Sequence, residues 1–234
     1  MSKNIDLSKE SPVKKEKIPI PDYTKGEEIF NMVSHIVGGA MGIAVAVLCI
    51  VFAAKKGNPY SVVSAAIFGS MMIILYSMSS IYHGLSPNLT KAKKVFRVLD
   101  HCTIFFLIAG TYTPIALCTL REYNTALGWT YFGIVWGLAI LGVTLTAVNL
   151  EKFKVLGMIF YIALGWCILP VLPKLISIMG KGGVAFLFLG GISYTIGAVL
   201  YGVGKKKRYM HSVFHIFIVI GSLLHFFCIL FYVL

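Results

Sequence analysis

Seven long apolar stretches follow one another along most of this chain, and they constrain its fold more than any other feature. Each is about as long as the helix of ~20 residues that crosses a bilayer core about 30 Å thick. A backbone inside lipid has to satisfy its own hydrogen bonds, and a single stretch does so as a helix. The sequence therefore predicts an all-α polytopic membrane protein with seven transmembrane helices, at residues 29–54, 60–84, 97–120, 125–148, 155–177, 182–203 and 211–234.

The composition agrees with a chain whose solvent is lipid. Apolar residues make up 58% and charged residues 13% of the 234, against about 45–50% and about 25% in soluble domains. Residues 1–28 are rich in Lys, Glu, Ser and Pro and contain no apolar run, so we expect a disordered cytoplasmic tail before one bundle at 29–234. The net charge of +12 does not indicate nucleic-acid binding, because the basic residues lie in short clusters between apolar stretches.

Lys and Arg are unevenly divided between the two sides of the predicted bundle. Sixteen lie in the tail and in alternate loops, and five lie on the opposite side. Because cytoplasmic loops hold the excess of these residues, the amino terminus is predicted inside and the carboxyl terminus outside the cell membrane. This orientation excludes a G-protein-coupled receptor, and the lack of Lys in residues 211–234 excludes a retinal protein.

Most ionisable residues inside the predicted helices share one depth. Each costs about 2.5–3.5 kcal/mol on insertion scales, so each needs a compensating interaction. Since the helices alternate in direction, six of the seven fall near the cytoplasmic face, and His225 lies about 15 Å deeper. The seven are His35, His83, Asp100, His101, His211, His215 and His225.

Three of these histidines are predicted to bind a metal ion. His211 and His215 are four residues apart, so both imidazoles point the same way. Two histidines with this spacing are typical of a metal site, and hydrogen bonding at a helix interface is the alternative. His83 ends the second helix and would be the third ligand, or else a histidine that reaches the headgroups. Three imidazoles leave zinc one position for water, the arrangement of a catalytic site.

Asp100 and Ser79 are the residues predicted to act beside the metal. Asp100 brings a carboxylate to the layer from the third helix, and we expect it to hold and polarise water at the metal. An ion pair with Arg97, three residues earlier on the same face, is the alternative. Ser79 lies one turn before His83 on the same face of the second helix.

The remaining polar residues of the layer are interpreted as supporting groups. Glu28, Asn31 and His35 form one stripe on the first helix, for which packing through a polar network is favoured over a direct metal role of His35. His101 is rotated about 100° from Asp100 and is predicted to face another neighbour. His225 is interpreted as a hydrogen-bonded group between helices.

Four motifs carry a resemblance to a known family. EEIFNMVSH, SSIYH, VLDHCTIFFLIAGTYTP and HSVFH occur in this order, and they resemble the bacterial hemolysin III proteins, which are relatives of the progestin and adipoQ receptors and, more distantly, of the alkaline ceramidases. The resemblance covers about residues 27–234. It implies that His83, His211 and His215 match the family's zinc ligands, and that Ser79 and Asp100 match its Ser and Asp beside the metal.

Three functions are compatible with these residues. The favoured one is a zinc-dependent hydrolase of a membrane lipid amide or ester, in which Asp100 orients water and accepts its proton and Ser79 supports the oxyanion. The alternative is a non-enzymatic regulator of lipid homeostasis with structural zinc. A pore-forming hemolysin ranks lowest, because no predicted helix carries a continuous polar stripe. The glycine-rich helix faces leave open whether the bundle forms a homo-oligomer.

Overall fold

Helices form all the regular structure of residues 20–203 and 207–234, which are the residues that the computed structural model describes. Residues 1–19, most of the predicted tail, lie outside this part. The polytopic all-α class is confirmed. The elements are α1 (Lys25–Lys56), α2 (Pro59–Gly84), α3 (Thr90–Pro114), the π-helical η1 (Ile115–Leu120), α4 (Arg121–Tyr123), α5 (Thr125–Val148), α6 (Leu150–Trp166), the 3-10 turn η2 (Leu169–Val171), α7 (Leu172–Val203) and α8 (Met210–Tyr232).

Six stretches of the described chain are long and apolar enough to cross a membrane: Lys25–Lys56, Pro59–Gly84, Thr90–Tyr123, Thr125–Val148, Leu150–Gly202 and Met210–Tyr232. The fifth has 53 residues, and one straight helix of that length would measure about 80 Å. This stretch folds back instead, since Trp166 Nε1 donates to Thr195 Oγ1 at 3.0 Å. The protein is therefore a multi-pass integral membrane protein, while seven crossings and the inside amino terminus stay predictions.

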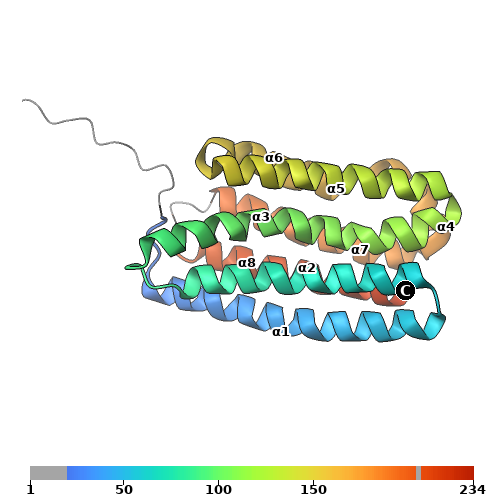
Figure 1. The fold of residues 1–234 in the computed structure, drawn as a ribbon, viewed down its shortest axis with the longest axis horizontal. Helices are drawn as coiled ribbons and strands as arrows, with labels where there is room; N and C mark the ends of the chain where they lie inside the picture. The colour runs from blue at the N-terminus through green and yellow to red at the C-terminus, as the bar shows by residue number, and fades with distance from the viewer. Residues whose placement is uncertain (1–19, 204–206) are drawn as a thin grey trace, which may run out of the picture.

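The helices lie side by side as one bundle with roughly parallel long axes (Figure 1). α1 packs along α2 and α8, α2 packs along α3, and α7 packs along α8. The stretch Thr90–Tyr123, which contains α3, is central in the bundle, because 89% of its most apolar residues are buried, against 22% in the stretch Thr125–Val148 that forms α5. Large apolar side chains are exposed on the outside, as on α1, where Val37 is 60% exposed. Such a surface is unfavourable in water and suits a lipid-facing position.

The start of α1 differs from the predicted boundary. Its cap is Thr24, whose hydroxyl accepts from the backbone N–H of Glu27 while Glu27 accepts from the backbone N–H of Thr24. This reciprocal capping box satisfies two backbone donors that a helix otherwise leaves unpaired. The helix consequently begins at Lys25, and the predicted tail of residues 1–28 extends about one turn too far.

The break between the fifth and sixth predicted helices lies where the sequence places it, between residues 177 and 182. Gly180 falls in this range, and its φ of 67° and ψ of 175° are not helical, so it separates two helical segments within α7. A further interruption, between the end of α6 at Trp166 and the start of α7 at Leu172, lies inside the predicted helix of residues 155–177. Pro170 and Pro173 explain this interruption, because proline lacks the N–H that continues a helix but fits its first turn.

Glycines allow α1 and α2 to approach closely. A Cβ on Gly38 would lie 2.7 Å from ring atoms of Tyr76, and one on Gly69 would lie 2.6 Å from the Cα of Ala46. Small residues at a helix interface are the usual device for such packing in membranes. Glycine therefore lets the two helices come close at both positions.

Replacing Gly69 by Ala is expected to destabilise the protein by about 1–3 kcal/mol, because the methyl group meets the backbone of α1. Gly137→Ala is the matched control, since a Cβ at that position meets nothing within 4 Å, and its better helix propensity predicts an unchanged or slightly higher stability. Thermal unfolding of the detergent-purified variants measures both. Equal melting temperatures for the two variants would contradict the close packing.

Candidate metal centre

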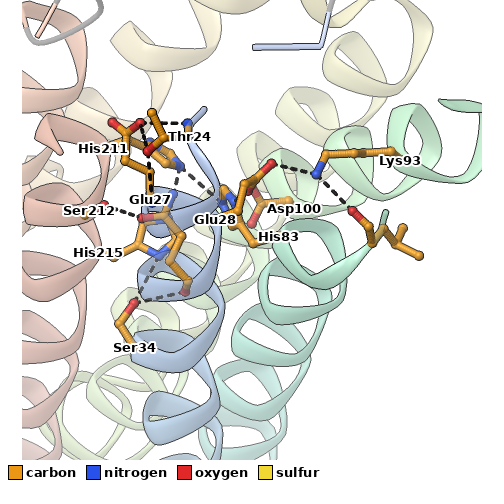
Figure 2. Close-up of polar contacts among 12 residues, drawn as sticks. Thr24, Glu27, Glu28, Ser34, His83, Lys93, Asp100, His211, Ser212 and His215 are labelled. Atoms are coloured by element: carbon orange, nitrogen blue, oxygen red, sulfur yellow. Dashed lines mark hydrogen bonds and ion pairs between the residues drawn. The ribbon is translucent and has the colours of Figure 1, made fainter. Parts of the chain in front are cut away.

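One end of the bundle gathers the polar residues of four helices (Figure 2). The beginnings of α1, α3 and α8 meet the last turn of α2 at this end, which we call the histidine end. His83 comes from that last turn, and His211 and His215 come from the first two turns of α8. Because the contributing helices alternate in direction, residues far apart in the sequence reach the same layer, as the sequence predicts.

The imidazoles of His83, His211 and His215 converge through their Nε2 atoms. His211 Nε2 lies 3.3 Å from His83 Nε2 and 3.1 Å from His215 Nε2. One nitrogen from each of the three rings lies within 4.8 Å of the others. Tetrahedral zinc with Zn–N bonds of 2.0–2.1 Å would hold its nitrogens about 3.3 Å apart, so the spacing fits this ion.

Hydrogen bonds on the far side of two rings set their tautomers. His83 Nδ1 lies 2.5 Å from Glu28 Oε2, which can only accept, so the ring hydrogen is on Nδ1. The Ser34 hydroxyl donates to the Asn31 carbonyl, and its oxygen therefore accepts from His215 Nδ1 at 3.4 Å. Both neutral rings consequently direct an Nε2 lone pair inward.

These lone pairs are the feature that fits a metal. A single hydrogen on His211 Nε2 cannot satisfy both His83 and His215, whereas a cation between the three nitrogens would satisfy all of them. His211 Nδ1 has no hydrogen-bond partner among the described residues. The donor set, three neutral imidazoles with hydrogen-bonded outer nitrogens on two of them, is the kind that binds zinc.

Glu28 connects three helices at this centre. Its second oxygen, Oε1, accepts from the Lys93 ammonium at 2.6 Å, and Lys93 also donates to the Leu85 carbonyl at 3.1 Å. Lys93 is only 1% exposed. The sequence predicts Lys93 only as one of the basic residues in a loop, because nothing in its cluster distinguishes it from Lys91 and Lys94.

Asp100 and Ser79 lie where the sequence predicts, beside the histidines. Both side chains are buried, and both line a cavity that His211 and His215 also line. His101 differs from the expectation, because its Nδ1 lies 3.6 Å from Asp100 Oδ2, so the two face each other and not different neighbours. Arg97, the alternative partner considered for Asp100, donates to Glu151 Oε1 at 2.8 Å.

The stripe on α1 faces α2 and α8. Asn31 Oδ1 accepts from the Ser212 hydroxyl at 2.7 Å. The His35 ring stacks on His215 with 3.7 Å between ring centres, and neither of its nitrogens has a hydrogen-bond partner in the described part of the chain. His35 therefore lies against one of the three converging rings, outside their group.

Tyr23 covers the histidines from the segment before α1. Its ring stacks on His211 with 5.0 Å between centres and an interplanar angle of 13°. Burial, with a smaller contribution from Tyr201, raises the pKa of the Tyr23 hydroxyl above its usual value. Glu27 ties the same region to α8 by accepting from the Tyr209 backbone N–H at 2.7 Å. The sequence predicts that Tyr23 belongs to the tail of residues 1–28, because no local pattern marks its contact with His211.

A largely apolar cavity of about 230 Å³ extends from this centre into the bundle. Asp100, Ser79 and His211 line the end near the metal centre. The cavity passes Tyr112 and Trp166 and includes His225 on α8, ten residues or about 15 Å beyond His215 along that helix. Its size and lining suit a chain of methylene groups.

Comparison with known proteins identifies the family. The family model "Haemolysin-III related" matches residues 23–226. A hemolysin-3 homolog of Bacillus subtilis is 37% identical over 210 residues, 90% of this chain and 96% of that protein. Hemolysin-3 of Bacillus cereus is also 37% identical, over 89% of this chain and 92% of its own. The adiponectin receptor protein of Drosophila melanogaster is 23% identical over 85% of this chain and 49% of its own length.

The residues matched by the family model include His83, Asp100, His211 and His215, and the family model and the two Bacillus relatives agree with the resemblance carried by the four motifs. The chain is therefore a multi-pass membrane protein that belongs to the haemolysin-III-related family.

Proposed function

We propose that this protein is a zinc-dependent hydrolase of a membrane lipid, acting on an amide or ester bond. The observation that carries the proposal is the convergence of three imidazole Nε2 atoms beside Asp100, at one end of an apolar cavity. The polar layer lies near one end of the bundle, the depth at which lipid acyl carbonyls occur. With the predicted orientation, the substrate comes from the inner leaflet of the cell membrane.

The protein's own residues supply binding and proton transfer. His83, His211 and His215 would hold the ion, which when bound supplies a Lewis acid that polarises a carbonyl and acidifies water. Asp100 would orient a water molecule and accept its proton as the water attacks the carbonyl carbon. The Ser79 hydroxyl would donate to the oxygen that gains negative charge. The cavity would take the acyl chain of the lipid.

A second candidate function is a non-enzymatic regulator of membrane lipids in which zinc is structural. The observation that favours it is the sharing of Glu28 between His83 and Lys93, which already joins α1, α2 and α3 at the site. A bound ion would add α8 to this junction through His211 and His215. This function predicts that zinc removal lowers the melting temperature and that no lipid product forms under any condition.

The names of the two Bacillus relatives refer to haemolysis, and a pore-former is the third candidate. It ranks lowest, because the cavity described above has a largely apolar lining and a channel for ions needs a polar one. Conductance of the pure protein in planar bilayers, absent after heat inactivation, would reverse this order.

Zinc content is the first prediction. We expect about one zinc per chain in the purified protein and almost none in the double variant His211→Ala/His215→Ala, because one imidazole is too few to retain the ion. Elemental mass spectrometry measures both, with His225→Leu as a control on the same helix that keeps its zinc. A wild-type protein without metal after zinc is supplied would mean that the histidines form a polar packing network.

Glu28 is expected to tune the zinc affinity. Glu28→Gln keeps the size of the side chain but removes the charge that holds His83 Nδ1, so zinc should bind about 10–100-fold more weakly. Competition with a chelator of known affinity measures the change. Glu122→Gln is the control, because Glu122 lies away from the histidines and accepts from Asn58. Unchanged affinity in Glu28→Gln would remove Glu28 from the metal site.

Asp100 is expected to act in turnover and not in zinc retention. Asp100→Asn should keep about one zinc per chain and lower lipid hydrolysis by about 10²–10⁴-fold, the usual contribution of a general base. Zinc content and the release of free fatty acid from a membrane-lipid extract are measured on the same preparation. A variant with full hydrolase activity would exclude Asp100 from the mechanism.

A further inference from the structure

The inner end of the cavity carries polar groups that the proposed chemistry does not use. His225 on α8 and Tyr194 on α7 both line it, and their rings meet edge to face with 5.1 Å between centres. Each of them is an aromatic ring with a polar atom, in a cavity whose lining is largely apolar. Polar side chains at this depth in a membrane protein are unfavourable unless they have a partner, so they mark sites of function.

His225 presents an unpaired hydrogen-bond acceptor. Its Nε2 lies 3.2 Å from the Leu187 carbonyl, which only accepts, so Nε2 carries the ring hydrogen. A charged imidazole is unfavourable at this depth, and the neutral ring then has its lone pair on Nδ1. His225 is 6% exposed, and its Nδ1 has no partner among the residues that the structure describes. The predicted hydrogen bond between helices is therefore present at Nε2 of His225, whereas Nδ1 makes none with the described residues.

Tyr194 belongs to a hydroxyl cluster with a spare donor. The Tyr76 hydroxyl donates to Ser222 Oγ at 2.6 Å, and Tyr194 and Ser222 share one hydrogen bond of 2.7 Å. The Tyr76 hydroxyl also lies 3.4 Å from the Ile218 carbonyl. Either hydroxyl of the Tyr194–Ser222 pair can be the donor, and when Ser222 donates, the hydrogen of Tyr194 is free for a ligand in the cavity that Tyr194 lines.

Two glycines make room for these rings. A Cβ on Gly190 would collide with the His225 ring, and a Cβ on Gly221 would collide with the Tyr194 ring. Glycine costs helix stability relative to alanine. A larger residue in place of either glycine would displace the neighbouring ring, so the two glycines allow both rings their positions beside the cavity.

We propose that His225 and Tyr194 form a subsite for a hydroxyl group within the acyl chain of the lipid. A hydroxyl donates to His225 Nδ1 and accepts from Tyr194, so it satisfies both groups at once. A keto oxygen would leave His225 Nδ1 unpaired, and an unsubstituted chain would leave both groups unpaired. The subsite lies about 15 Å from the histidine end along α8, which places the hydroxyl in the middle of a long chain. The inference rests on the proposal that the cavity holds an acyl chain.

The test compares stearic acid with a series of monohydroxystearic acids that differ in the position of the hydroxyl. Binding to the full-length protein in lipid nanodiscs is measured by displacement of a fluorescent fatty acid. We expect one mid-chain isomer to bind about tenfold more tightly than stearic acid, the effect of pairing buried polar groups. His225→Leu should abolish this preference, because it removes the acceptor for the hydroxyl. Tyr194→Phe, which keeps the ring, should weaken the preference in the same way.

The same affinity for stearic acid and for every isomer would overturn the subsite. So would an equal loss of both affinities in Tyr194→Phe, since that variant keeps the ring that shapes the cavity. The measurement is repeated on Asp100→Asn and on zinc-depleted protein, because binding does not require turnover. If the wild-type protein prefers one hydroxystearic acid but hydrolyses no lipid, the proposed hydrolase is rejected and the subsite stands. If it hydrolyses lipid but binds all the acids equally, the subsite is rejected and the hydrolase stands.

Discussion

The Glu28 carboxylate is shared between His83 and Lys93, and this contact organises the histidine end of the bundle. Lipid offers no hydrogen-bond partners, so each buried polar group of this layer has to find its partner within the protein. Lys93 and His83 each take one oxygen of Glu28, which joins the beginnings of α1 and α3 to the end of α2. The same contact places the hydrogen of His83 on Nδ1, and its Nε2 lone pair therefore points at His211.

The direction of that lone pair has consequences for the rest of the site. Ser34 has the same effect on His215, so two acceptors face the single nitrogen of His211. A cation between the three nitrogens would satisfy all of them, whereas hydrogen bonds among the imidazoles cannot. Asp100 and Ser79 then lie where the bundle interior begins, at the end of the cavity where a lipid carbonyl and water would meet.

Polarity is distributed along the cavity at two separate places. The histidine end holds the ionisable groups, and His225 with Tyr194 forms a second polar point about 15 Å further into the bundle. Between them the lining is largely apolar. An amphiphile with a polar bond at one end and a polar substituent within its chain would match both places, whereas a plain hydrocarbon chain would match only the first.

Much of the fold could be predicted because helix formation in a membrane is a local property. The apolar stretches, their lengths and the i, i+4 relation of His211 and His215 depend on residues close in sequence. The common depth of His83, Asp100, His211 and His215 follows from helices that alternate in direction. The predicted break at residues 177–182 coincides with Gly180, whereas the cap at Thr24 starts the first helix about one turn earlier than predicted.

What the sequence by itself determined is which residues lie at which depth, since rise per residue and span length are properties of one helix. The tertiary structure decided how each helix is rotated about its axis and which side chains meet across the gap. Those choices depend on packing between residues that are far apart in the chain, and they place Lys93 on Glu28 and Tyr23 on His211. They also leave His225 Nδ1 without a partner beside the cavity, a vacancy that no local pattern reveals.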